Sequence, residues 1–172
     1  MATSCDACPE NSFSTGGKPT CTCKGGFSQD GFGRDLNCTA CGVNEYSNPG
    51  DTECKPCPDG STSNGAAASC DCRPGYALSG EGDTLVCTEC QPGQFSETGT
   101  SCELCPAGTF SESLSSSNCT ECPEFSISTP GSATCKCRAG YATSGTGSTL
   151  ECTPCEAGTY SVDGVECVPC PS

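Results

Sequence analysis

The fold is decided by residues 87–105, which read CTECQPGQFSETGTSCELC. Two Cys-x-x-Cys pairs bracket a short loop that holds one aromatic residue, Phe95, followed by a serine. Pro and Gly near the start of the loop, and Gly again near its end, favour turns and oppose long helices. The stretch therefore predicts a short hairpin closed by cysteines.

The same spacing runs along the whole chain. All 22 cysteines fall in Cys-x-x-Cys or Cys-x-Cys pairs. The cysteines of 57–105 recur 65 residues later, and those of 8–41 recur 49 residues later. Such self-similarity indicates an internal repeat. We predict a short first repeat at 1–56, a full repeat at 57–121 and a truncated repeat at 122–172.

The composition leaves little material for a core. Among the 172 residues, Leu, Ile, Val and Phe together number 18, against 22 Cys, 22 Gly and 13 Pro. A disulfide that closes a loop of about 15 residues stabilises a fold by about 3 kcal/mol, so crosslinks can replace a core. We predict a small disulfide-rich, all-β or irregular fold. Its expected form is an elongated rod of tandem disulfide-closed hairpin loops, with little core and no long helices.

Charge and cysteine usage restrict the partners and the compartment. The chain carries 7 basic and 21 acidic residues, a net charge of −14. Nucleic acids and anionic membranes are poor partners for such a surface. Abundant disulfides require an oxidising compartment, which predicts an extracellular or cell-surface location. No stretch is long and apolar enough to span a membrane, and 1–20 contains no signal-peptide core, so we expect a mature piece or a fragment of a longer chain.

The absence of histidine excludes several kinds of chemistry. With no His, catalytic triads and mixed Cys/His zinc sites are excluded, and we expect no enzymatic activity. One alternative remains, an all-cysteine zinc site formed by Cys87, Cys90, Cys102 and Cys105. The intervening Cys-x-Cys pairs and the regular loops favour disulfides instead. No catalytic residue, metal site or cofactor is predicted.

Other residues keep register within the loops. In the seven loops that are not opened by Cys-x-Cys, the fifth residue after the opening cysteine is usually aromatic, and the next residue is always Ser. One ring per loop predicts a miniature core that covers the disulfide. The fifth residues are Phe13, Tyr46, Thr62, Phe95, Phe110, Ile127 and Tyr160, and glycines expected in tight turns with positive φ follow at Gly50, Gly99, Gly131 and Gly164.

Two recurring strings resemble known families. The Cys-x-Cys loops continue C-R-P-G-Y at Cys72 and C-R-A-G-Y at Cys137, which is similar to the last loop of epidermal growth factor-like modules. The string C-P-A-G-T-F-S at Cys105 resembles ephrin-receptor-like, or GCC2/GCC3, cysteine-rich repeats and, more distantly, tumour necrosis factor receptor modules. The resemblance implies extracellular disulfide architecture, as in receptors, adhesion proteins and protist surface or mastigoneme-type proteins.

Repeat logic gives one hypothesis for the disulfide pairing. The second cysteine of each pair opens a loop, and the first cysteine of the next pair closes it, in agreement with the loops of the two resembling families. The predicted bonds are Cys8–Cys21, Cys23–Cys38, Cys41–Cys54, Cys57–Cys70, Cys72–Cys87, Cys90–Cys102, Cys105–Cys119, Cys122–Cys135, Cys137–Cys152 and Cys155–Cys167. Cys5 and Cys170 are left over, as a closer and an opener that an inter-chain or continuing bond would pair.

Surface residues supply further candidates. Asn37 and Asn118 begin Asn-Cys-Thr sequences that satisfy the N-glycosylation rule. Exposed aliphatic side chains could support lateral association between copies. The candidates are Leu78, Leu85, Val86, Leu114, Val162 and Val168.

The leading functional hypothesis is a non-enzymatic extracellular structural protein. A disulfide-laddered repeat array would form part of a filament, a mastigoneme-like surface appendage or a matrix, through head-to-tail and lateral self-association. Other extracellular proteins or glycans are further expected partners. The alternative hypothesis is the ligand-binding or stalk ectodomain of a cell-surface receptor or adhesion protein, in which irregular loops carry recognition.

Overall fold

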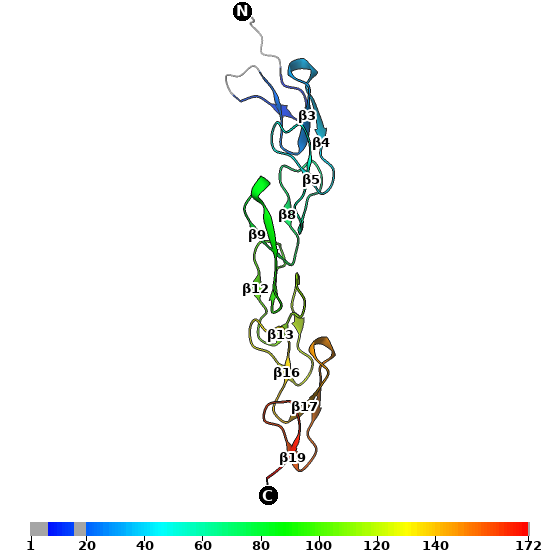
Figure 1. Ribbon diagram of the computed structural model, residues 1–172, viewed down its shortest axis with the longest axis vertical. Helices are drawn as coiled ribbons and strands as arrows, with labels where there is room; N and C mark the ends of the chain where they lie inside the picture. The colour runs from blue at the N-terminus through cyan, green and yellow to red at the C-terminus, as the bar shows by residue number, and fades with distance from the viewer. Residues whose placement is uncertain (1–6, 16–19, 172) are drawn as a thin grey trace, which may run out of the picture. The chain divides into compact units, whose positions relative to one another are not determined.

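The computed structural model describes residues 7–15 and 20–171 (Figure 1). These ranges contain short β-strands paired into ten antiparallel two-stranded hairpins, together with three 3₁₀ turns and no α-helix. Each hairpin pairs two neighbouring strands of the chain, so no crossover connection is present in the described part. The prediction of a small all-β, disulfide-rich fold is confirmed.

Seven hairpins have strands of two residues. They pair β1 (Ser12–Phe13) with β2 (Thr22–Cys23), β5 (Glu45–Tyr46) with β6 (Lys55–Pro56), β7 (Ser61–Thr62) with β8 (Asp71–Cys72), β11 (Gln94–Phe95) with β12 (Glu103–Leu104), β13 (Thr109–Phe110) with β14 (Thr120–Glu121), β15 (Ser126–Ile127) with β16 (Lys136–Cys137) and β19 (Thr159–Tyr160) with β20 (Val168–Pro169).

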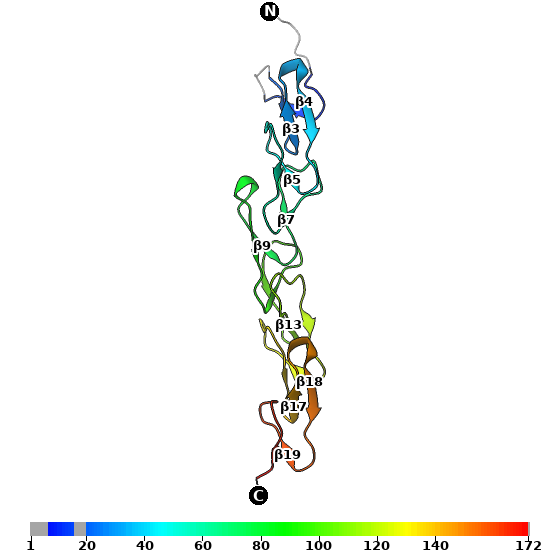
Figure 2. The same ribbon diagram turned by 45° about the vertical axis from the view of Figure 1, so that its right-hand side comes forward.

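Three longer hairpins, which we call arms, carry a 3₁₀ turn at their tips. The first arm pairs β3 (Phe27–Asp30) with β4 (Asn37–Ala40), the second pairs β9 (Tyr76–Ser79) with β10 (Val86–Glu89), and the third pairs β17 (Tyr141–Ser144) with β18 (Glu151–Pro154). Their tips hold η1 (Gly33–Asp35), η2 (Gly82–Thr84) and η3 (Gly147–Thr149). Figure 2 shows the third arm with its two strands side by side.

One disulfide closes each hairpin, and the ten bonds are the same ten pairs as in the serial scheme. We number the hairpins 1 to 10 by their bonds in chain order: Cys8–Cys21, Cys23–Cys38, Cys41–Cys54, Cys57–Cys70, Cys72–Cys87, Cys90–Cys102, Cys105–Cys119, Cys122–Cys135, Cys137–Cys152 and Cys155–Cys167. The arms are thus hairpins 2, 5 and 9. The four cysteines of the alternative zinc site belong to three different disulfides.

The chain forms two compact units. Unit 1 comprises Met1–Arg73 and Leu78–Cys87, and unit 2 comprises Pro74–Ala77 and Thr88–Ser172. The division passes through hairpin 5: its tip and both of its disulfide cysteines belong to unit 1, whereas Pro74–Ala77 belongs to unit 2. The repeat limits at 56 and 121 stay predictions, because a division by compactness does not test them.

A left-handed turn precedes the first strand of every hairpin. The third residue after each opening cysteine has positive φ, a conformation that glycine adopts freely and that asparagine tolerates. These residues are Asn11, Gly26, Asn44, Gly60, Gly75, Gly93, Gly108, Phe125, Gly140 and Gly158. The turns predicted at Gly50, Gly99, Gly131 and Gly164 are confirmed, since each has positive φ as well.

Neighbouring hairpins are joined by a repeated set of backbone hydrogen bonds. In unit 2, the Gly93 amide of hairpin 6 donates to the Ser111 carbonyl of hairpin 7 at 2.8 Å. The Gly131 amide of hairpin 8 donates to the Cys105 carbonyl of hairpin 7, also at 2.8 Å. The same two kinds of bond recur in unit 1, for example from Gly26 to Ser47. Within each unit, neighbouring hairpins thus hold one another, as in a repeat protein.

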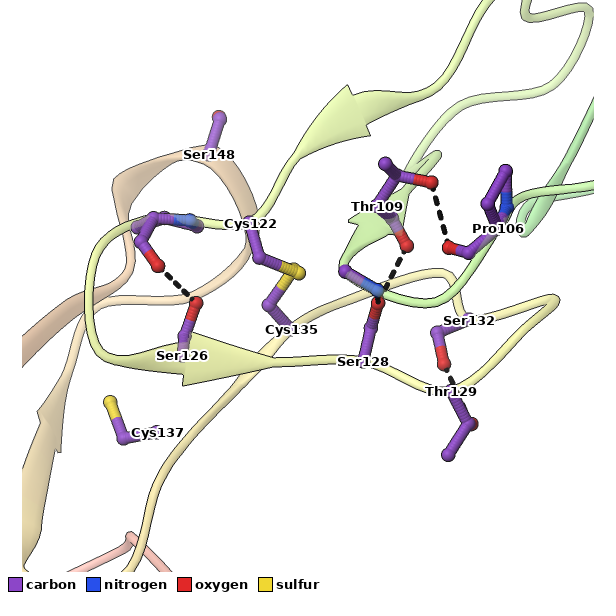
Figure 3. The surroundings of a disulfide bond; sticks show 12 residues. Pro106, Thr109, Cys122, Ser126, Ser128, Thr129, Ser132, Cys135, Cys137 and Ser148 are labelled. Atoms are coloured by element: carbon purple, nitrogen blue, oxygen red, sulfur yellow. Dashed lines mark hydrogen bonds between the residues drawn. A yellow bond between two sulfur atoms is a disulfide. The ribbon is translucent and has the colours of Figure 1, made fainter.

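The serine that follows the fifth position lies in these junctions between hairpins. Most of these serines are buried, because only a small side chain fits between two disulfide-closed layers. In unit 2 the Ser161 hydroxyl accepts a hydrogen bond from the Gly164 amide at 3.1 Å. Figure 3 shows Ser128 donating to the Thr109 carbonyl at 2.7 Å, from hairpin 8 to hairpin 7. The Ser47 hydroxyl is buried and has no partner within the described residues.

This difference between serines makes a matched test. We expect Ser161→Ala to lower the free energy of unfolding by about 1–2 kcal/mol, because the buried Gly164 amide loses its acceptor. Ser47→Ala should change it little or raise it slightly, because a buried hydroxyl without a partner is removed. Denaturant unfolding of the unreduced variants measures both. Equal losses in the two variants would contradict this interpretation.

Candidate interaction sites

The second arm folds back onto hairpin 3, within unit 1. Asp83, in η2 at the tip of the arm, accepts hydrogen bonds from the Tyr46 hydroxyl at 2.9 Å and from the Asn48 amide at 3.2 Å. The Lys55 ammonium also binds the Asp83 carboxylate at 3.0 Å and bridges to Asp51 at 3.1 Å. One carboxylate of the arm therefore receives three donors of the hairpin.

The contact changes the acidities of its members. Hydrogen bonds from Lys55 and then Tyr46 hold the pKa of Asp83 below its ordinary value of 3.8. Hydrogen bonds to Asp83 and Asp51 raise the pKa of Lys55 above its ordinary value. Burial, followed by the hydrogen bond to Asp83, raises the pKa of Tyr46. Because Lys55 and Asp83 are largely exposed, the network determines where the arm lies more than it adds stability.

We expect the contact between Asp83 and hairpin 3 to depend on pH in a defined direction. A lowered pKa in the folded state means that the carboxylate stabilises the arm above pH 3.8. That contribution is lost as the pH falls through the folded pKa, when Asp83 gains a proton. Carboxyl-detected NMR titration should give Asp83 a midpoint below 3.8, accompanied by shift changes at Tyr46. In Asp83→Asn, the Tyr46 shift should no longer follow this midpoint, and a midpoint above 3.8 in the native protein would contradict the contact.

The third arm covers hairpin 7 in the same way, within unit 2. Leu150 of the arm is buried in one cluster with Phe110, Cys135 and Cys137. The backbone amide of Ser148, in η3, donates to the Glu112 carboxylate at 2.6 Å. In both units an arm therefore covers the hairpin that lies two places before it in the chain.

Arm coverage corrects the prediction of one buried ring per loop. Tyr46 and Phe110, the fifth residues of the two covered hairpins, are only 5 % and 1 % exposed. Phe13, Ile127 and Tyr160 occupy the same position in hairpins without an arm and are substantially exposed. The prediction of a covered core residue at this position is wrong for Phe13, Ile127 and Tyr160, because a two-residue strand is too short to bury a large side chain without an arm above it.

Each arm contributes a buried leucine, which supplies the apolar core that the aromatic rings were expected to form. Leu36, Leu85 and Leu150 stand two residues before the closing cysteine of each arm and are buried. Leu85 was predicted to be exposed and available for lateral contact, and this is wrong. The missed signal is the recurrence of Leu at this position in the three Cys-x-Cys loops.

Most of the other residues predicted for lateral association, and both predicted glycosylation sites, are exposed to solvent. Leu78, Val86, Leu114 and Val162 are exposed, and Val168 is partly buried. Asn37 and Asn118 are both exposed, and the Asn37 amide lies 3.4 Å from the Thr39 hydroxyl of its own sequon. Among the described cysteines, Cys170 is free and exposed. Cys5 lies outside the described residues.

Within the described ranges, no group of three or more His, Cys, Asp and Glu side chains is arranged to hold a metal ion. The helical segments there are three short 3₁₀ turns, none of which could cross a bilayer. A polar hollow of about 350 Å³ lies beside the serine-rich loop of hairpin 7, between Phe110, Leu114 and Ser148. The hollow and the two arm contacts are the candidate contact surfaces of the described residues.

Comparison with known proteins supports the resemblance seen in the motifs. Residues 93–137 match the family described as tyrosine-protein kinase ephrin type A/B receptor-like. The match covers most of hairpin 6 and all of hairpins 7 and 8, and it includes the backbone bonds from Gly93 to Ser111 and from Gly131 to Cys105. No curated protein sequence matched the chain. Residues 93–137 are similar to an ephrin-receptor-like repeat, and with ten disulfides in tandem along the described residues the chain is a cysteine-rich protein with the architecture of extracellular disulfide-rich domains.

Proposed function

We propose that the chain is a non-enzymatic structural protein that self-associates in an extracellular filament, surface appendage or matrix. The observation that carries the proposal is the repeated junction between neighbouring hairpins. Backbone amides and carbonyls make the same bonds from one hairpin to the next in each unit, so an array of this kind can be lengthened by adding hairpins. The lack of histidine supports a role without catalysis.

The regular surface also supports a structural role. A series of disulfides, each closing a loop of 12 to 15 residues, resists unfolding without a large core. The acidic surface keeps the chain soluble until specific contacts form. We further propose that Asn37 and Asn118 carry N-linked glycans, since both are exposed sequon residues of an extracellular domain.

One observation favours the alternative, a ligand-binding or stalk ectodomain of a receptor or adhesion protein. The family match covers hairpin 7, whose serine-rich loop borders the polar hollow. A small polar ligand, a glycan or an exposed peptide would fit a surface of this kind. In this alternative the repeats act as a spacer, and the chain stays monomeric.

Self-association distinguishes the two functions. Unreduced protein with its free thiols alkylated is examined by negative-stain electron microscopy and sedimentation over a wide range of concentrations. Polymers that grow with concentration are expected for a structural protein. Particles that remain monomeric at every concentration would overturn the structural proposal and favour the ectodomain.

A further inference from the structure

Asn64 stands directly before Gly65, and no other asparagine of the chain precedes a glycine. In such a pair the glycine nitrogen can attack the side-chain amide of the asparagine, because glycine has no Cβ to obstruct the approach and its backbone rotates freely. A hydrogen bond that held either amide would slow this reaction. The pair is therefore a candidate for chemical modification if both amides are unbonded.

Both amides of this pair are unbonded within the described residues. The Asn64 side chain is exposed, and no hydrogen bond there involves its amide or the backbone amide of Gly65. Gly65 has φ of 85° and lies in a bend of hairpin 4, outside the strands. The next amide, that of Ala66, donates to the Cys41 carbonyl at 2.9 Å. The reactive pair thus lies directly beside a junction between hairpins, while its own two amides stay unbonded.

The other asparagines of the described residues are less suited to this reaction. Asn48 precedes Pro49, whose nitrogen carries no hydrogen to lose. The Asn44 side-chain oxygen accepts a hydrogen bond from the Thr62 hydroxyl at 2.7 Å. The remaining three precede a disulfide-bonded cysteine or a residue whose amide is already hydrogen-bonded, and they are Asn11, Asn37 and Asn118. Asn64 is therefore the asparagine expected to react first.

We propose that Asn64 deamidates spontaneously and that the isoaspartate formed there opens the junction between hairpins 3 and 4. The Gly65 nitrogen attacks Cγ of Asn64 and ammonia leaves, which closes a succinimide ring. Water then opens the ring. Attack of water at the side-chain carbonyl gives aspartate, and attack at the main-chain carbonyl gives isoaspartate, in which the chain runs through the side-chain carbon. The net reaction consumes one water, releases one ammonia and changes no oxidation state, so the product accumulates with the age of the protein.

The residues directly after this pair join hairpin 4 to hairpin 3. The Ala66 amide donates to the Cys41 carbonyl at 2.9 Å, and the Ala67 carbonyl accepts a hydrogen bond from the Ser47 amide at 3.3 Å. Ala67 also pairs with Tyr46 in a short β-bridge. Isoaspartate inserts one methylene group into the backbone just before these residues. Because both bonds depend on the present position of that backbone, the insertion displaces their donor or acceptor.

Ageing of the unreduced full chain tests the modification site. The chain is incubated in warm neutral buffer, and isoaspartate is located by enzymatic methylation and by peptide mapping with electron-transfer fragmentation. Asn64 should lose its amide before any other asparagine. Asn64→Gln is the matched control, because it keeps an exposed amide on a longer side chain that forms the corresponding ring far more slowly. An Asn64 that survives as long as Asn44 would overturn the proposed site.

Hydrogen exchange tests the effect on the junction. The isoaspartate form is separated from the unmodified chain by anion exchange, since it carries one more negative charge. Its Ala66 and Ser47 amides should exchange more than about tenfold faster, because each has lost the bond that protected it. Freshly prepared Asn64→Asp carries the same charge without the added methylene and should exchange like the native chain. Unchanged exchange in the isoaspartate form, or equal acceleration in Asn64→Asp, would overturn opening of the junction by the inserted methylene.

Discussion

Replacing Phe110 by Ala is expected to lower the free energy of unfolding by about 3–5 kcal/mol, the usual cost of removing a buried aromatic ring. The ring is 1 % exposed and lies in one cluster with Leu150, Cys135 and Cys137. Its loss would leave a cavity that the disulfides on either side prevent from collapsing. Denaturant unfolding of the unreduced protein, followed by circular dichroism, measures the change.

Phe13→Ala is the control for this prediction, because Phe13 holds the same position in hairpin 1 but is 37 % exposed. We expect its loss to cost no more than about 1 kcal/mol, since little apolar surface is removed from a covered site. A loss at Phe110 as small as that at Phe13 would show that the third arm does not cover hairpin 7 in solution.

Gly93→Ala is expected to separate hairpin 6 from hairpin 8. Gly93 has φ of 85°, and a Cβ there would clash with the backbone carbonyl of Gly131. The left-handed conformation costs an alanine about 1–2 kcal/mol, and the clash adds about 1–3 kcal/mol. Because the Gly131 amide bonds to the Cys105 carbonyl, its hydrogen exchange should accelerate more than tenfold in the variant.

Gly108→Ala separates the two costs. Gly108 has φ of 83°, yet nothing lies within 4 Å of the position that its Cβ would take. This variant should therefore be destabilised only by the left-handed backbone conformation. Hydrogen exchange at the Gly131 amide should change little. If the two alanines accelerated that amide equally, the close approach of the hairpins at Gly93 would be disproved.

The local features of the fold could be predicted from the sequence. Each closing cysteine follows its opener within one short loop, so repeat logic leads to the serial pairing, and glycines such as Gly131 mark the turns. The left-handed turn three residues after the opener was overlooked, because Asn44 and Phe125 replace glycine there and break the string. Phe125 is tolerated in this conformation while its ring stacks on Tyr141, with centroids 4.8 Å apart.

The arm contacts could not be predicted in the same way. Whether Tyr46 or Tyr160 is buried depends on an arm that belongs to another hairpin two places away, and no pattern within the loop encodes it. The network at Asp83 joins residues that are far apart in sequence and scattered among other polar residues. The sequence reveals only the arms' part of these contacts. When the arm sequences are aligned with one another, a leucine recurs at one position, and Leu85 and Leu150 at that position are buried.

The shortness of every crosslink has a consequence for how the protein is made. Each bond joins cysteines 12 to 15 residues apart, and none reaches beyond its own hairpin. A loop of this size closes in well under a microsecond, whereas translation adds about 5–20 residues per second. The two cysteines of a hairpin therefore meet many times before the next pair is made, and the oxidation step, which takes seconds to hours, limits how fast each bond forms. Because the entropic cost of closing a loop grows with its length, each opening cysteine still meets the closing cysteine of its own hairpin more often than it meets those of distant hairpins, which favours the serial pairing.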